Sequence, residues 1–273
     1  MAAIEAPSLA SEAVAQIGSF EIRNTMVMAW LAMAVFLVLG LLLRRTKYKE
    51  VPGRFQTFME MIVEGLFDFF DSVVGDRERT RKFFPLVATI FLFLVLANWM
   101  GILPGVGSIT IQGLHEGHLM NIPLFRSMNA DVNMTLAIAI VSVVMTQVFG
   151  IAALGVLPYA GKYFVAPWRD PIMSFVGILE LIAEFAKVVS FTFRLFGNIF
   201  AGEILLGVAA TLLVMVTGTE KIWYAIPGGL IQIPFMALEL LVGLIQAFIF
   251  STLTLVFISM FTVHQTVTRK EEH

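Results

Sequence analysis

The chain has 273 residues, of which 58% are hydrophobic and 14% charged, with a formal net charge of −2 at pH 7 and no cysteine. Soluble globular domains are usually about 45–50% apolar and about 25% charged, so this composition favours a membrane protein over a soluble enzyme. The charge gives no reason to expect a nucleic-acid partner, and the lack of cysteine excludes disulfides, thiolate metal sites and a cysteine nucleophile.

Residues 1–24 are an acidic segment that precedes the first apolar run. They carry Glu5, Glu12 and Glu21 against a single arginine, Arg23. A secretory signal begins with a basic region and ends at a small-residue cleavage site, whereas here a full-length apolar run follows directly. We therefore expect an outer N-terminal segment over residues 1–24 and a first span that is retained.

Three apolar runs of membrane-spanning length follow, at residues 25–43, 83–103 and 132–157. A run of about 18 or more apolar residues is long enough to cross the bilayer core. Residues 25–157 are thus predicted to hold three transmembrane helices, and the second is expected to end at Gly101, Pro104, Gly105 and Gly107.

A helix of another kind is predicted at residues 52–75, between the first two runs. Its apolar residues recur at helical spacing, and Glu60, Glu64, Asp68 and Asp71 fill the other face. Such an amphipathic helix is suited to lying in the membrane interface. A soluble amphipathic hairpin packed on a partner is the alternative.

The last two apolar segments, residues 170–216 and 231–267, are too long for simple crossings. The first has 47 residues, or about 70 Å as a helix at 1.5 Å per residue, and the hydrocarbon core is only about 30 Å thick. With few helix breakers inside, the segments are predicted to form a long, steeply tilted hairpin over residues 170–267. Its turn is expected at residues 217–229, where Gly218, Pro227, Gly228 and Gly229 supply breakers.

Lysine and arginine predict the orientation, because they accumulate on the cytoplasmic side of bacterial membranes. Nine of the 18 lie in residues 44–82, and those that share their predicted side are Lys162, Arg169, Arg269 and Lys270. Arg23, Arg126 and Lys221 stand on the other side. The sequence thus predicts an all-α polytopic membrane protein with five crossings, an outer N-terminus and an inner tail at residues 268–273.

Polar and ionisable residues gather in the final two helices, where each charge costs about 2.5–3.5 kcal/mol on insertion scales. They are Glu180, Glu184, Lys187, Ser190, Arg194, Asn198, Glu203, Glu239 and Gln246. At about 100° per residue, Glu180, Lys187, Ser190 and Asn198 share the face of Arg194, and Glu203 points elsewhere.

The hairpin register also follows from the sequence. With a turn centred near residue 221, Arg194 lies opposite a position near 248 and Glu203 opposite one near 239, so Gln246 and Glu239 become the expected partners. We expect an Arg194–Gln246 pair. The Glu203–Glu239 pair would bring two carboxyls together and favour a shared proton.

This order places acids on an outer path, Arg194 in the middle, and Glu180 and Glu184 on an inner path. A permanent cation between two half-paths would stop ions from passing straight through, and arginine keeps its charge when desolvated. The alternative is that Arg194 neutralises a neighbouring acid in a packed bundle, and residue types alone leave both open. A self-contained ion channel or secondary transporter, which would conduct by itself, and a structural scaffold, which would tolerate loss of Arg194, are the competing functions.

Three motifs bear on this choice. Residues 191–206 read FTFRLFGNIFAGEILL, residues 244–250 and 252–260 read LIQAFIF and TLTLVFISM, and residues 129–136 read NADVNMTL. Together they strongly resemble the F-type ATP synthase subunit a family, and the resemblance covers most of residues 83–273. RLFGN followed by AGE is the most specific part.

The resemblance implies a non-catalytic, proton-translocating stator in a bacterial inner membrane, with a periplasmic N-terminus and a cytoplasmic C-terminus. Its implied partners are a ring of c subunits, the peripheral-stalk b subunits and lipid, with H⁺ as the transported ion and no cofactor. It implies that Arg194 is the essential arginine facing the ring, with Asn198 and Gln246 as polar companions. The remaining implied ion-path residues are Glu203, Glu239 and Asp131 for the outer half-channel and Glu180 and Ser190 for the inner one. Some relatives carry a histidine at one of the two positions that Glu203 and Glu239 occupy here.

Three further features are given lesser roles. His115 and His118 offer two possible ligands, short of the three or four that a zinc site needs, and a loop at the outer channel mouth is the favoured interpretation. Lys187 is expected to face the inner interface or to extend toward water, and Gln147 to form a hydrogen bond between helices.

Overall fold

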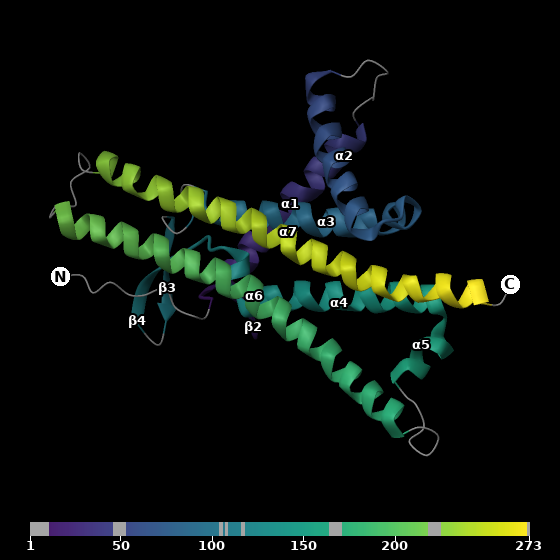
Figure 1. The fold of residues 1–273 in the computed structure, drawn as a ribbon. Coiled ribbons are helices and arrows are strands. Elements are labelled where there is room, and N and C mark those ends of the chain that lie inside the picture. Colours follow the sequence, from purple (N-terminus) through teal and green to yellow (C-terminus); the bar gives the residue numbers. More distant parts are fainter. Residues whose placement is uncertain are drawn as a thin grey trace. The chain divides into compact units, whose positions relative to one another are not determined.

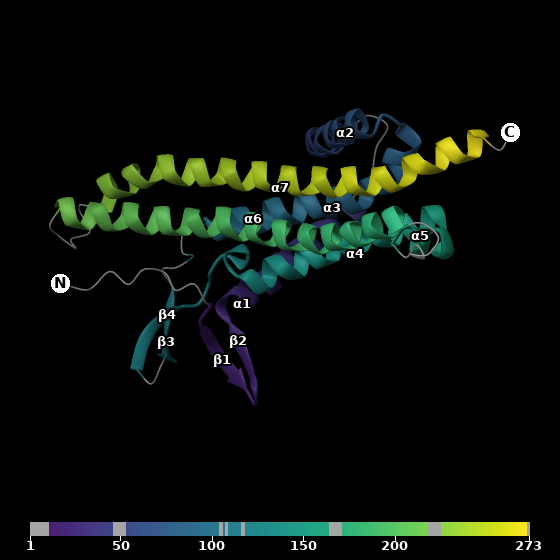
Figure 2. The same cartoon turned by 60° about the horizontal axis from the view of Figure 1, so that its bottom comes forward.

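The computed structural model describes residues 11–45, 53–103, 106, 109–115, 118–163, 171–217 and 225–271. Seven α-helices and two β-hairpins make up this part of the chain (Figures 1 and 2). In chain order these elements are β1 (Ala13–Ile17), β2 (Phe20–Arg23), α1 (Asn24–Arg45), α2 (Arg54–Val74), α3 (Arg77–Gly101), β3 (Thr110–His115), β4 (His118–Pro123), a 3₁₀ turn (Met128–Ala130), α4 (Val132–Leu154), α5 (Val156–Tyr163), α6 (Pro171–Thr217) and α7 (Ala225–Glu271).

The described helices are those of a polytopic membrane protein. Four helical stretches are long and apolar enough to cross a membrane, namely Asn24–Arg45, Arg77–Gly101, Val132–Leu154 and Ile233–Met260. The first three correspond to the three predicted transmembrane helices, and the fourth lies in α7. α6 is not among these four stretches of the described residues, so a fifth crossing stays a prediction.

The two β-hairpins and α5 were not expected from the sequence. β1 and β2 pair antiparallel and end at Ile17 opposite Phe20, with Gly18 at a φ of 65° in the turn between them. Glycine suits this left-handed conformation because it has no Cβ. β3 and β4 pair in the same way. The hydropathy pattern failed to reveal them because such short strands lie beside much longer apolar runs.

The predicted turn between the last two helices is partly wrong. α6 ends at Thr217 and α7 already begins at Ala225, so Pro227, Gly228 and Gly229 lie in the first turns of α7. Proline is tolerated there because the first N–H groups of a helix have no intrahelical acceptor. Gly218 and Lys221 lie outside the described residues.

The prediction that the first long segment stays unbroken is confirmed. α6 is one helix of 47 residues, or about 70 Å at 1.5 Å per residue. α7 is equally long and continues through Pro234. The tilt of the two helices relative to a bilayer stays a prediction.

The contacts divide the chain into two compact units. The first combines residues 1–41, 92–135 and 193–247, and the second combines residues 42–91, 136–192 and 248–273. Within the first unit, the C-terminal half of α6 and the N-terminal half of α7 run side by side in both views (Figures 1 and 2).

The second unit contains an aromatic and aliphatic core between α2, α3 and α7. The buried residues of this cluster are Phe70, Phe83, Val87, Leu255 and Ile258. α2 thus buries Phe70 against its own chain, whereas its Phe55, Phe58 and Met61 are exposed. The predicted amphipathic helix is confirmed as a helix, and its place in the membrane interface stays a prediction.

α5 packs on α4 through a close approach of Tyr159 to Gly150. A Cβ added at Gly150 would lie 2.6 Å from Cε2 of the Tyr159 ring. We expect Gly150→Ala to lower the free energy of unfolding by about 1–3 kcal/mol, the usual cost of overpacking. Thermal unfolding in detergent measures this. The control is Gly161→Ala, where a Cβ would meet nothing within 4 Å; equal losses in both variants would contradict the packing explanation.

Candidate functional site

One face of α6 in the first unit is exposed and carries a single arginine. Leu195 and Ile199 point inward and are buried, whereas the outward residues are Phe193, Arg194, Gly197, Asn198, Ala201, Ile204, Leu205 and Val208. These positions recur every three or four residues and so form one stripe along the helix. We call these eight residues the Arg194 stripe.

The pairing of Asn198 with Gln246 agrees with the predicted register of the last two helices, and a contact between Arg194 and Gln246 stays a prediction. Asn198, one helical turn after Arg194, donates a hydrogen bond from its Nδ2 to Gln246 Oε1 at 2.6 Å. Gln246 is buried on α7. The pair thus fixes Asn198 at the edge of the Arg194 stripe.

Buried amides hold this part of α7 in place. Asn98 Nδ2 donates to the Gly243 carbonyl at 2.9 Å, and Asn129 Nδ2 donates to Asn98 Oδ1 at 2.7 Å. A Cβ added at Gly243 would lie 3.0 Å from Cβ of Asn98, so glycine permits the close approach of α3 to α7. These contacts set the positions of Glu239 and Gln246, one turn away on either side.

Glu203 forms an ion pair that the sequence analysis missed. Arg126 Nε and Nη2 both donate to Glu203 Oε2, at 3.2 and 3.1 Å. Arg126 follows β4 and is only 7% exposed, although the charge count had treated it as an outer-loop cation. The sequence signal that could have suggested this ion pair is the position of Arg126, five residues before Asp131 and close to the start of a predicted span. A cation at such a boundary can reach a buried acid.

Glu239 lies on α7 beside Gly202, the residue that precedes Glu203. A Cβ added at Gly202 would lie 2.6 Å from Glu239 Oε1, so glycine makes room for this carboxyl. Glu239 is 8% exposed, and its Oε2 has no hydrogen-bond partner among the described residues. The structure therefore brings Glu203 and Glu239 to the same region, as predicted, and it adds an ion pair between Arg126 and Glu203 that was not predicted.

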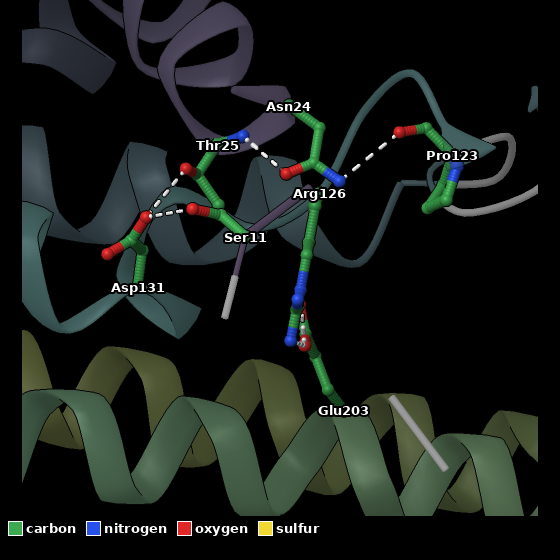
Figure 3. A network of polar contacts seen from close by, with 7 residues as sticks. All are labelled: Ser11, Asn24, Thr25, Pro123, Arg126, Asp131 and Glu203. Atoms are coloured by element: carbon green, nitrogen blue, oxygen red, sulfur yellow. Dashed lines mark hydrogen bonds and ion pairs between the residues drawn. The ribbon is translucent and has the colours of Figure 1, made fainter. Parts of the chain in front are cut away.

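Asp131 is the centre of a separate polar network at the start of α4 (Figure 3). Ser11 Oγ and Thr25 Oγ1 donate to Asp131 Oδ2 at 2.6 and 2.9 Å, and the backbone N–H of Asn133 donates to Asp131 Oδ1 at 2.8 Å. The last bond caps α4. Burial alone would raise the pKa of Asp131, but these hydrogen bonds outweigh it and hold the pKa below its ordinary value.

In the second unit, α6 contributes a paired acid and base. Lys187 Nζ donates to Glu184 Oε1 at 2.7 Å and lies 4.3 Å from the centroid of the Phe257 ring. Gln147 Nε2 donates to Glu184 Oε2 at 2.8 Å, so the predicted interhelical hydrogen bond of Gln147 is confirmed. The ammonium of Lys187 is held by Glu184, and the expectation that Lys187 faces the inner interface or extends toward water stays a prediction.

Two tyrosines of α5 complete the cluster around Glu184 and Gln147. The hydroxyl of Tyr159 donates to Gln147 Oε1, and that of Tyr163 donates to the same oxygen at 3.4 Å. Burial is the main cause that raises the pKa of both Tyr159 and Tyr163. The two phenols therefore stay protonated at physiological pH and act as donors.

Three expected site features are placed without a confirmed role. Glu180 is half-buried and Ser190 is exposed on α6, and their inner-path roles stay predictions. His115 and His118 pair across the β3–β4 ladder, and Glu116 between them lies outside the described residues.

Comparisons with known proteins agree on one family. The family described as ATP synthase A chain matches residues 26–259. A protein of Desulfotalea psychrophila named ATP synthase subunit a is 35% identical over 88% of this chain and 84% of its own length. Proteins of the same name from Geotalea daltonii and Moorella thermoacetica are 32% and 30% identical, over 84% and 90% of this chain and 83% and 93% of their own lengths.

Proposed function

Because the chain belongs to the ATP synthase subunit a family, a membrane subunit of the Fo sector that takes part in proton transport, we propose that it is the stator past which a ring of c subunits turns. In this proposal two offset half-channels open to opposite sides of the membrane, and Arg194 separates them. The subunit itself is non-catalytic. The c ring and the peripheral-stalk b subunits are its protein partners.

The observation that carries the proposal is the exposed cation of the Arg194 stripe. Phe193, beside Arg194, is 59% exposed, and the other outward residues from Gly197 to Val208 are apolar or small except for Asn198. A guanidinium among exposed apolar groups is costly in lipid, so this face is better covered by another protein than by lipid. A passing c subunit that presents a carboxylate would provide such a cover.

The chemistry follows from a permanent charge. Arg194 favours the ionised form of any carboxylate that approaches it, because an opposite charge within about 4–6 Å lowers the pKa of that acid. A ring carboxyl would thus release its proton into one route before passing Arg194 and take up another proton after passing. Glu203, Glu239 and Asp131 would serve the outer route, and Glu180 and Ser190 the inner one.

The proposed orientation and tilt fit the same function. We place the N-terminus in the periplasm and the C-terminus in the cytoplasm of a bacterial inner membrane. α6 and α7 would lie steeply inclined, because each is about 70 Å long at 1.5 Å per residue against a core of about 30 Å. A steep incline would spread the Arg194 stripe along the curved side of a ring.

The absence of cysteine from the chain permits a direct test of which α6 face meets the ring. We expect a photo-cross-linker attached to Ala201→Cys in the assembled complex to capture the c subunit, identified by mass spectrometry. Ile199→Cys is the matched control, since Ile199 is 2% exposed on the opposite face. Capture of c from position 199 but not from position 201 would refute the proposal.

A further inference from the structure

The outer acids are not equivalent, because a buried cation is committed to one of them. Two Arg126 nitrogens, Nε and Nη2, donate to Glu203 Oε2, and Figure 3 shows the arginine side chain extending from its loop toward Glu203 on α6. Hydrogen bonds between an ionised donor and an ionised acceptor are about twice as strong as neutral ones. Arg126 therefore favours the ionised form of Glu203.

Glu239 has the opposite surroundings. It is buried, its Oε2 has no hydrogen-bond partner among the described residues, and the acid on the facing helix, Glu203, has the same charge sign. A buried carboxylate without a partner is expensive, and such a group takes up a proton instead. Glu239 is thus the acid of the pair that gains most from being protonated.

We propose that Arg126 is a positioning residue that holds Glu203 as a fixed carboxylate, so that Glu239 alone carries the exchangeable proton of the outer route. This assignment rests on the proposed function, and it replaces a proton shared between the two acids by a division of tasks. Arg126 and Glu203 form a neutral unit, and only Glu239 changes charge when a proton passes.

The consequence is that proton exchange at Glu239 depends on the balance of charge between Arg126 and Glu203 more than on either residue alone. If Arg126 is removed, two close carboxyls remain and compete for a proton. If Glu203 is removed, Arg126 is left buried and turns to Glu239, which it would hold ionised. If both are removed, Glu239 faces no buried charge from this pair and regains its exchangeable proton.

The test compares Arg126→Gln, Glu203→Gln and the double variant in the whole ATP synthase, in inverted membrane vesicles. ATP-driven proton pumping is measured per assembled complex as a function of pH. We expect each single variant to lose pumping by about tenfold or more, since breaking a buried pair leaves an uncompensated charge. The double variant is expected to return to within about threefold of the unaltered complex, which is the non-additivity of coupled residues.

The pH profile separates this role from a structural one. We expect Arg126→Gln to move the profile toward higher pH by about one unit, because the cation that favoured ionised carboxyls is gone, and the double variant to restore it. Arg126→Lys keeps the charge and is expected to keep the original profile even if fewer complexes assemble. An unshifted profile in Arg126→Gln would overturn the inference.

Glu239→Gln distinguishes failure of this inference from failure of the proposed function. We expect it to stop pumping both alone and in the double-variant background. A double variant as inactive as the single ones would show that Glu203 itself relays protons, and the inference would fall while the stator function stands. Normal pumping by Glu239→Gln would remove the outer route of the proposed function.

Discussion

ATP-driven proton pumping is expected to fall to background in a complex that carries Arg194→Ala. Arg194 is exposed on the face of α6 that we assign to the ring, and its charge would force each passing carboxyl to give up its proton. With alanine in its place nothing favours the ionised carboxyl at that point, so rotation no longer separates release from uptake. Fluorescence quenching of a pH-sensitive dye in inverted vesicles measures the pumping.

Lys187→Met is the matched control, because it removes a cation from the same helix. Lys187 is held by Glu184 at 2.7 Å and its charge is already committed. We expect this variant to keep most of its pumping, although Glu184 then loses a partner. Arg194→Lys should also be strongly impaired, since lysine changes its protonation readily when desolvated. Normal pumping in Arg194→Ala would exclude the gating role and leave only a packing role for this residue.

Much of the fold was predictable because long apolar helices leave a strong sequence signal. The helices at residues 25–43, 83–103 and 132–157 appear as α1, α3 and α4 within a few residues, and α6 is unbroken as expected. The two β-hairpins were missed, because strands of four to six residues give little periodicity beside such runs. The start of α7 was predicted too late in the sequence, because Pro227, Gly228 and Gly229 were interpreted as helix breakers. The first turn of a helix tolerates proline.

In the candidate site too, features set by local sequence spacing were predictable, and contacts between distant residues were not. Helix periodicity and a constant residue sum across the hairpin predicted that Gln246 and Glu239 face the middle of α6, and both do. The hydrogen bond from Asn198 to Gln246 was not predicted, because the exact donor depends on how far each side chain reaches. Arg126 could not be assigned to Glu203, since the two are 77 residues apart and no spacing rule connects a loop to a distant helix.

Asp131→Ala is expected to have the largest effect on stability among the variants considered. Asp131 is 6% exposed, and it accepts bonds from Ser11, Thr25 and the N–H of Asn133. Leaving such buried donors unsatisfied costs about 1–3 kcal/mol each, so we expect a loss of about 3 kcal/mol or more. Thermal unfolding of the purified chain in detergent measures the loss. Glu21→Gln is the control, because the Glu21 side chain makes an exposed contact of 3.6 Å with Arg23.

Asp131→Asn isolates the charge of this network and gives it a pH dependence. Hydroxyls can donate or accept, so asparagine keeps several bonds and should cost only about 1 kcal/mol, the charge-assisted part. The folded pKa of Asp131 is below the ordinary 3.8, so its stabilising charge is fully present above pH 3.8 and is lost as pH falls through the lowered value. The stability gap between the unaltered chain and Asp131→Asn should therefore be constant from neutral pH down to about pH 4 and close below it. A gap that instead widened on acidification would show that the carboxyl is protonated in the folded chain, and Asp131 would then belong with Glu239 among the groups that hold a proton.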